Sequence, residues 1–151
     1  MGQPPDRKAG FDLIPAVDYG RIVQDYDARR SGPRPHDSGL VVDQALAFVA
    51  TAAAIFTEGR WAELPHPLVP SWDIARAWEV LIKHTTVYRA LAEKLGVFID
   101  WLPYSEALPV DVEKTMVAID VTNFVLHGQV WTDEPAGARA GVAGLYLGAA
   151  P

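Results

Sequence analysis

The chain has 151 residues, of which 50% are apolar and 21% are charged, a composition typical of one folded domain that buries about two thirds of its unfolded surface. Its net charge of −6 argues against attraction to phosphate backbones, so we do not expect nucleic acid as a partner. Because the chain contains no cysteine, disulfides, thiolate metal sites and cysteine nucleophiles are excluded.

The first 15 residues have the composition of a flexible leader. They contain Pro4, Pro5 and Gly10 and lack the apolar core that a signal peptide needs. We therefore predict a leader over residues 1–15 and a cytoplasmic protein. Apolar side chains then recur through residues 16–29 with the spacing of a first helix.

A second helix is predicted to begin at Asp37 or Ser38 and to end near Thr57. Apolar residues cover most of its circumference, which predicts a central position in the monomer or a contact across a dimer interface. Its longest apolar run, Ala45 to Phe56, falls well short of the roughly 20 residues that span a bilayer, so we expect a core helix and no membrane contact.

The longest regular pattern in the chain follows Pro70. Apolar residues recur every three or four positions from Ile74 to Leu95, which predicts one long helix with one buried face. Ser71 is placed to cap its first turn. Gly96 is placed to end it in the left-handed conformation.

The chain after this helix contains two further apolar segments. Residues 97–102 are bulky and apolar except for Asp100 and predict a buried extended segment. Another helix is predicted from Pro109 to Asn123, whose side chain suits a left-handed stop. Residues 124–131 predict a second extended segment, and residues 136–151 form a tail rich in glycine and alanine.

These elements together predict a mainly all-α fold, a compact bundle of about four helices with short extended segments. The predicted domain covers residues 16–135, between the leader and the tail. The sequence contains no phosphate-binding glycine loop and no close pairing of histidines, so we predict neither a cofactor nor a metal site.

One set of residues resembles a known family. It comprises Pro70-Ser71, Ile74, Ala77-Trp78, Ile82, His84-Thr85, Tyr88, Gly96, Phe98-Ile99 and Pro103. In this spacing the chain resembles a group of small actinobacterial proteins of unknown function, related to the conserved helical segment of glycine-rich-domain proteins. The resemblance extends over residues 40–131 and implies a mainly helical fold.

The departures from that family concern its polar residues. Members carry an aspartate, several histidines and a cysteine at positions where this chain has other residues. Those positions hold Ala75, Glu79, Ala92, Asp100 and Trp101. The histidine and cysteine cluster of the family is therefore lost, and the resemblance implies no reaction for this chain.

Two interpretations of the remaining polar residues stay open. Glu79 and Lys83 have the i, i+4 spacing of an exposed ion pair on a helix. His84 lies at the edge of the buried stripe, where a structural histidine with satisfied hydrogen bonds is expected. The alternative is that His84 is an acid–base group, oriented by Glu79 or Asp100.

Aromatic residues flank the same segment. Trp78 and Tyr88 belong to the predicted buried stripe, whereas Trp72 and Trp101 adjoin loops or extended segments, where aromatic rings often meet a ligand or a partner. Packing is the simpler explanation for these rings. If they converge, they line a binding pocket for a flat or hydrophobic small molecule.

We therefore carry two hypotheses about function. The first is a non-catalytic helical module that binds a small hydrophobic or aromatic molecule or a protein partner, a second copy of the chain included. The second is a small cofactor-independent enzyme of specialised metabolism, with the aromatic residues as its substrate pocket and acid–base chemistry at His84, Glu79 or Asp100.

Overall fold

The structure is a computed structural model, and it describes residues 6–30, 36–57, 68, 70–102, 112–131 and 145–150. Its elements, in chain order, are the 3-10 helix η1 (Gly10–Leu13), α1 (Ala16–Arg29), α2 (Ser38–Thr57), α3 (Trp72–Lys83), α4 (Thr85–Leu95), β1 (Phe98–Leu102), α5 (Val112–Val121), the 3-10 helix η3 (Gly128–Trp131) and β2 (Leu145–Ala150). The prediction of a mainly helical fold is confirmed.

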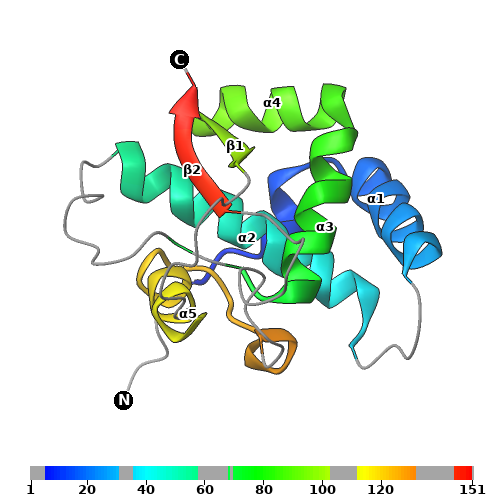
Figure 1. The fold of residues 1–151 in the computed structure, drawn as a ribbon, viewed down its shortest axis with the longest axis horizontal. Helices are drawn as coiled ribbons and strands as arrows, with labels where there is room; N and C mark the ends of the chain where they lie inside the picture. Colours follow the sequence, from blue (N-terminus) through cyan, green and yellow to red (C-terminus); the bar gives the residue numbers. More distant parts are fainter. Residues whose placement is uncertain are drawn as a thin grey trace.

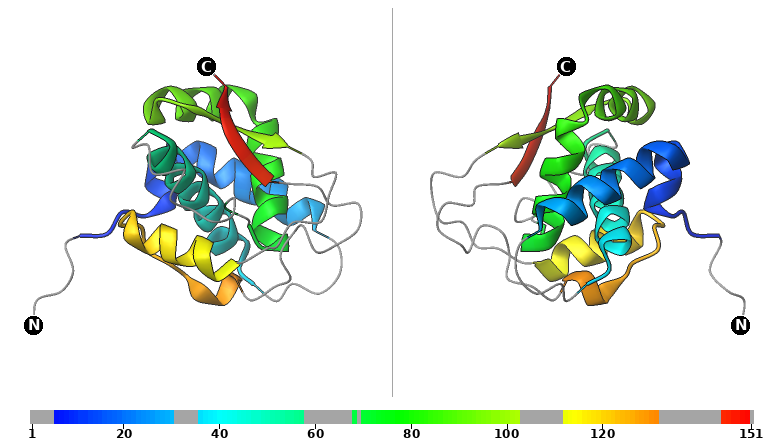
Figure 2. Two further views of the ribbon diagram at one scale, coloured as in Figure 1. Left: turned by 60° about the vertical axis from the view of Figure 1, so that its left-hand side comes forward. Right: turned by 90° about the vertical axis from the view of Figure 1, so that its right-hand side faces the viewer.

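Helix α2 runs through the centre of the molecule, with the other helices arranged around it (Figures 1 and 2). It contacts η1, α1, α3, α5 and both strands. Every residue from Val41 to Ala53 is buried, because an apolar surface on all sides of a helix is removed from water only when neighbours cover all of them. Its many alanines let these neighbours approach closely.

The same apolar character gives α2 a second property. By length and composition alone it could cross a membrane, but 78% of its most apolar window is buried inside the protein. Core helices of soluble proteins have the same two features. The prediction of a cytoplasmic protein without membrane contact stays a prediction.

The single helix predicted from Ile74 to Leu95 is wrong, because the chain bends at His84 and forms two helices, α3 and α4. The ψ angle of His84 is 72°, which is not helical. The two residues that follow, Thr85 and Thr86, are β-branched and favour helix weakly, so the bend costs little at this point. The break also explains why the described residues form five α-helices where about four were predicted.

A two-stranded sheet covers one end of the bundle (Figure 1). Gly96 ends α4 with a φ of 81°, in the left-handed conformation that the sequence predicts. Strand β1 follows and pairs antiparallel with β2, with Phe98 opposite Ala150 and Leu102 opposite Leu145. The last part of the predicted tail is therefore a strand of this sheet.

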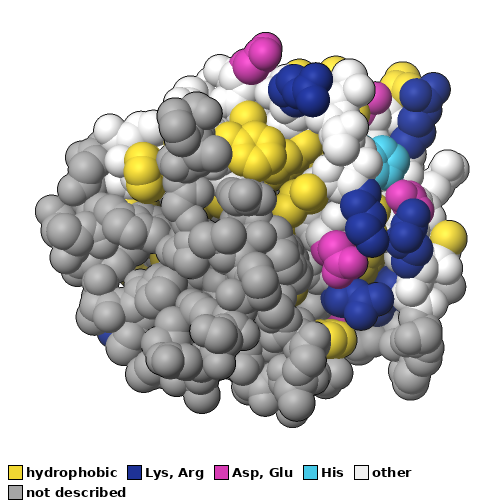
Figure 3. Space-filling view, turned by 45° about the horizontal axis from the view of Figure 1, so that its top comes forward, with side chains coloured by type: hydrophobic (Ala, Val, Ile, Leu, Met, Phe, Trp, Pro, Cys, Tyr) yellow, Lys and Arg dark blue, Asp and Glu magenta, His cyan; other side chains and the backbone are white. Residues whose placement is uncertain are grey.

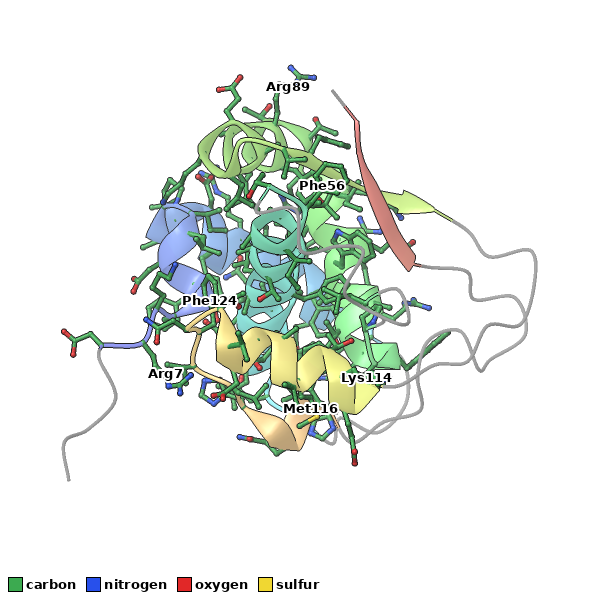
Figure 4. The ribbon with its side chains drawn as sticks, turned by 90° about the vertical axis from the view of Figure 1, so that its left-hand side faces the viewer. Arg7, Phe56, Arg89, Lys114, Met116 and Phe124 are labelled. Atoms are coloured by element: carbon green, nitrogen blue, oxygen red, sulfur yellow. The ribbon has the colours of Figure 1, made fainter. Side chains whose placement is uncertain are left out.

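The segment before α1 is also part of the fold. Lys8 and Phe124 form an isolated parallel bridge, and Gly10 is buried against α2. Residues 6–15, assigned by the sequence to a leader, therefore pack between α2 and the segment after α5. Figure 4 shows Arg7 and Phe124 on this side of the molecule.

The second predicted extended segment, residues 124–131, is correct only in its first part. Asn123 ends α5 with a φ of 69°, as predicted, but residues Gly128–Trp131 form η3. The reason is that the indole of Trp131 is drawn into the core, where it donates a hydrogen bond to Gln44. Pro109, the predicted start of α5, lies outside the described residues.

The start of α3 shows a similar difference. Ser71 occupies the N-cap position, as predicted, but its hydroxyl makes no capping hydrogen bond. It donates instead to the carbonyl oxygen of Val130, at 3.3 Å. The side chain therefore joins α3 to η3 rather than satisfying the first turn of its own helix.

Candidate functional site

His84 lies at the bend between α3 and α4, and its ring reaches across to α1. Its Nε2 lies 2.8 Å from Oδ2 of Asp25. The other carboxylate oxygen of Asp25, Oδ1, accepts a hydrogen bond of 2.6 Å from Nε of Arg29. The three side chains form a continuous chain from guanidinium through carboxylate to imidazole.

This arrangement fixes the electrostatics of Asp25. Hydrogen bonds from Arg29 and then from His84 lower the pKa of the Asp25 carboxyl below its ordinary value of 3.8. Asp25 is therefore ionised at neutral pH and holds the His84 ring in one orientation. Because Nε2 is engaged, Nδ1 is the ring nitrogen left to contact another molecule.

A cleft of about 770 Å³ opens beside His84, between η1, the first half of α1 and the length of α4. Its apolar lining consists of Leu13, Ile14, Pro15, Val87, Ala90 and Leu91. Its polar lining consists of Asp12, Asp18, Arg21, His84, Thr85, Thr86 and Lys94. Aliphatic walls with a few charged and hydrogen-bonding groups are typical of a small-molecule site.

The surroundings of the cleft carry charges of both signs. Figure 3 shows a histidine at the surface among Lys, Arg, Asp and Glu side chains. The side chain of His84 is 26% exposed and that of Asp25 is 29% exposed. The pair is therefore half-buried and accessible to a molecule of solvent or ligand.

Of the three predicted acid–base residues, His84 lines this cleft. Glu79 pairs with Lys83 at 3.2 Å, which is the contact that their i, i+4 spacing predicts. The side chain of Asp100 lies outside the described residues. The residue that orients His84 is Asp25, which comes from a different helix.

The predicted aromatic residues whose side chains the structure describes, Trp72, Trp78 and Tyr88, do not line the cleft. Trp78 is fully buried, and its Nε1 donates a hydrogen bond of 3.1 Å to the hydroxyl of Tyr88, itself a core residue. The ring of Trp72 lies 5.6 Å from the guanidinium of Arg76. The side chain of Trp101 lies outside the described residues, and among those described no aromatic side chain lines the cleft.

A second group of polar side chains lies in the core around Gln44. Oε1 of Gln44 accepts hydrogen bonds from the backbone N–H of His127 and the indole of Trp131, at 3.0 and 2.9 Å. Its Nε2 donates to Oδ2 of Asp43 and to the carbonyl of Val125, at 3.0 and 2.9 Å. An amide that makes all four of its hydrogen bonds within the protein acts as a structural support rather than as a binding site.

No three His, Cys, Asp or Glu side chains of the described residues are grouped so that they could hold a metal ion. Comparisons with protein-family models, curated proteins and solved structures found no match to this chain. The resemblance to small actinobacterial proteins therefore stays a prediction.

The sequence does not reveal three important residues of this site. Asp25, Arg21 and Lys94 lie on the polar faces of α1 and α4, where charged side chains are ordinary. Asp25 is 59 positions from His84, and nothing local connects the two. The one available signal is the placement of His84 at the edge of a buried stripe, where a histidine needs a partner.

Proposed function

We propose that the protein is a binding module for a small, mainly apolar molecule that occupies the cleft between α1 and α4. The observation that carries this proposal is the cleft itself, whose volume of about 770 Å³ falls within the roughly 300–1,000 Å³ of small-molecule sites. At its edge stands His84, held in place by Asp25.

The lining supports a ligand with a hydrocarbon part. Ile14 and Leu91 are buried, whereas Leu13 and Val87 are half-buried. A ligand that covers the remaining apolar surface gains about 0.8 kcal/mol for each methylene group that it buries. The charged residues around these walls fix its orientation through hydrogen bonds.

Heteronuclear NMR tests the proposal. The ¹⁵N-labelled protein is titrated with separate aliphatic, aromatic and charged small molecules, and the shifted amides are mapped onto the fold. The proposal expects saturable shifts from at least one compound, concentrated in residues 12–21 and 84–94. Shifts confined to other parts of the molecule, or no saturable shift from any compound, would overturn it.

The contact between His84 and Asp25 favours a second candidate, an enzyme that uses the same cleft as its substrate pocket. A carboxylate within hydrogen-bond reach of one imidazole nitrogen orients a general base, and the other nitrogen then exchanges a proton with substrate. In this reading Asp25 has the role that the sequence assigned to Glu79 or Asp100.

The enzyme reading has its own test. Any turnover found with a cleft ligand should depend on the imidazole of His84. The substitution His84→Ala should remove most of the rate. A rate unchanged in this variant would exclude His84 as the acid–base group.

A further inference from the structure

We infer that the ligand of the cleft is an aliphatic monocarboxylate, whose hydrocarbon chain lies along α4 and whose carboxylate is bound at the end formed by His84 and Arg21. This inference rests on the proposed function and names its ligand class. It follows from the shape of the lining, from the order of charges along it and from the hydrogen-bond donors at one end.

The walls of the cleft favour a ligand with a hydrocarbon chain. The six apolar residues of the lining are Leu13, Ile14, Pro15, Val87, Ala90 and Leu91. All six are aliphatic, and none of them offers an aromatic face for stacking. From His84 to Lys94 the cleft follows ten residues of α4, about 15 Å at the rise of an α-helix. A medium-length alkyl chain matches these walls better than a flat ring system does.

Residues of α1 determine where the carboxylate of the ligand binds. Arg21 lies one helical turn before Asp25 on the same face, and Asp25 is hydrogen-bonded to His84. Arg21 and His84 therefore both line the same end of the cleft. No ion pair of Arg21 occurs among the described residues, and its side chain is exposed. A guanidinium presents two parallel N–H groups that match the two oxygens of a carboxylate.

Two further donors belong to the same end. The first residues of α4, Thr85 and Thr86, line the cleft beside His84, and each hydroxyl can donate one hydrogen bond. The carboxylate of Asp25 is occupied by Arg29 and His84. It therefore orients His84 rather than offering a site for a cationic group.

The remaining charges of the cleft lie further from His84 than Arg21 does. Lys94 donates a hydrogen bond of 3.4 Å to the carbonyl of Leu13, so its ammonium group is engaged at the far end. Asp12 belongs to η1 at that end, and Asp18 lies one turn before Arg21 on α1. Two acids and two bases cancel in net charge. Along the cleft, the guanidinium of Arg21 lies at the His84 end and the ammonium group of Lys94 at the other. This order of charges selects the orientation of the ligand.

The test compares three ligands with the same eight-carbon chain: octanoate, octan-1-ol and octyltrimethylammonium. Dissociation constants are measured by calorimetry at low ionic strength, below the concentrations at which the probes form micelles, and NMR maps the binding. We expect octanoate to bind in the cleft about tenfold or more tightly than octan-1-ol, because charge-assisted hydrogen bonds are added to the same hydrocarbon contact.

Two variants test whether Arg21 causes the preference for octanoate over octan-1-ol. Arg21→Gln should reduce the affinity for octanoate to that for octan-1-ol and leave octan-1-ol binding unchanged. Arg89→Gln is the matched control, because Arg89 points away from α4 at the outer edge of the fold (Figure 4). This control should behave like the unaltered protein.

The other outcomes separate the two proposals. Equal affinities for octanoate and octan-1-ol in the cleft, or tightest binding of octyltrimethylammonium, would overturn the carboxylate while the binding module stands. Binding of an aromatic compound in the cleft with none of the three octyl probes would overturn the aliphatic class alone. Shifts from no compound at residues 12–21 and 84–94 would overturn both proposals.

Discussion

At the scale of single residues, Tyr88 joins three segments through one hydroxyl group. The hydroxyl accepts a hydrogen bond from the indole of Trp78 on α3 and donates one to the carbonyl of Ile99 on β1. Tyr88 itself belongs to α4 and is buried. The bend at His84 is stabilised by this contact, because α3 and α4 as one straight helix could not bring the indole and the hydroxyl together.

Removal of this hydroxyl should therefore destabilise the fold. We expect Tyr88→Phe to lower the free energy of unfolding by about 1–3 kcal/mol, the cost of breaking buried hydrogen bonds while the shape of the side chain is kept. Chemical denaturation followed by tryptophan fluorescence measures the change. A loss below about 0.5 kcal/mol, the range of ordinary surface substitutions, would contradict the assigned role.

Asp25 makes stability depend on pH in a defined direction. Because hydrogen bonds from Arg29 and His84 lower its pKa in the folded state, unfolding at acid pH takes up a proton. The stabilisation is therefore complete above the ordinary pKa of 3.8 and is lost as the pH falls through the lower folded-state value. Asp25→Asn should cost most stability above pH 3.8 and progressively less below it. A difference from the unaltered protein that stays constant through this acid range would be inconsistent with the lowered pKa.

At the scale of elements, the close approach of η1 to α2 depends on one glycine. A Cβ atom placed on Gly10 would lie 2.0 Å from the carbonyl oxygen of Asp43 and 3.1 Å from the backbone nitrogen of Ala47. Both contacts are to the backbone of α2, which cannot move aside as a flexible side chain would. The position of η1, and with it the wall of the cleft at Leu13 and Ile14, therefore requires glycine here.

A pair of glycine substitutions tests this packing. Gly10→Ala should destabilise the protein by about 1–3 kcal/mol, as overpacking of a core does. Gly20→Ala is the matched control, because Gly20 lies inside α1 with nothing within 4 Å of an added Cβ. This second substitution should stabilise the protein by about 0.5–1 kcal/mol. Thermal and chemical unfolding of both variants give the comparison, and equal effects of the two would refute the close approach.

Helices α1 and α2 could be predicted from the sequence, because the spacing of apolar residues within each segment indicates a helix. The bend at His84 could not, because the apolar spacing continues through it to Leu95 and only contacts with distant segments reveal the change of direction. The pairing of β1 with β2 joins residues more than 40 positions apart, and no local pattern encodes such a partner.

The candidate site shows the same limit. The sequence singled out His84 because its ring chemistry is distinctive, and His84 lines the cleft. The aromatic residues beside it were equally visible in the sequence, yet Trp78 and Tyr88 pack in the core. Whether a residue lines the cleft or packs in the core depends on which helix lies opposite it. The residues of α1 that complete the site, Arg21 and Asp25, are of types that are common on protein surfaces.

At the scale of the whole molecule, Asp43 and Gln44 together connect α2 to the segments on both sides of it in the sequence. Its amide bonds to residues 125–131, and Asp43 beside it accepts a hydrogen bond of 2.7 Å from the backbone N–H of Phe11. Two neighbouring side chains on one helix therefore hold η1 before α2 and residues 125–131 after α5. The nearby imidazole of His127 lies 4.0 Å from the Asp43 carboxylate.

Loss of the Gln44 side-chain amide should destabilise segments that are distant in the sequence. We expect Gln44→Leu, which removes four hydrogen bonds in the core, to lower the free energy of unfolding by roughly 3 kcal/mol or more. Hydrogen exchange should also accelerate at the backbone N–H of His127 and at the indole N–H of Trp131, which both donate to Gln44. Gln24→Leu on the exposed side of α1 is the control and should change stability by less than about 0.5 kcal/mol. Slow exchange retained at His127 in Gln44→Leu would disprove the connection.

The central claim is that the cleft between α1 and α4 is the binding site, and obstruction of the cleft tests it most directly. Ala90 lines the cleft from α4, whereas Ala28 is an exposed alanine on α1 outside it. The measurement is the dissociation constant of octanoate and of octan-1-ol for Ala90→Trp and for Ala28→Trp. We predict that Ala90→Trp weakens both ligands by about tenfold or more, equivalent to about 1.4 kcal/mol, and that Ala28→Trp changes neither. If Ala90→Trp and Ala28→Trp bound each ligand with equal affinity, the claim would be contradicted.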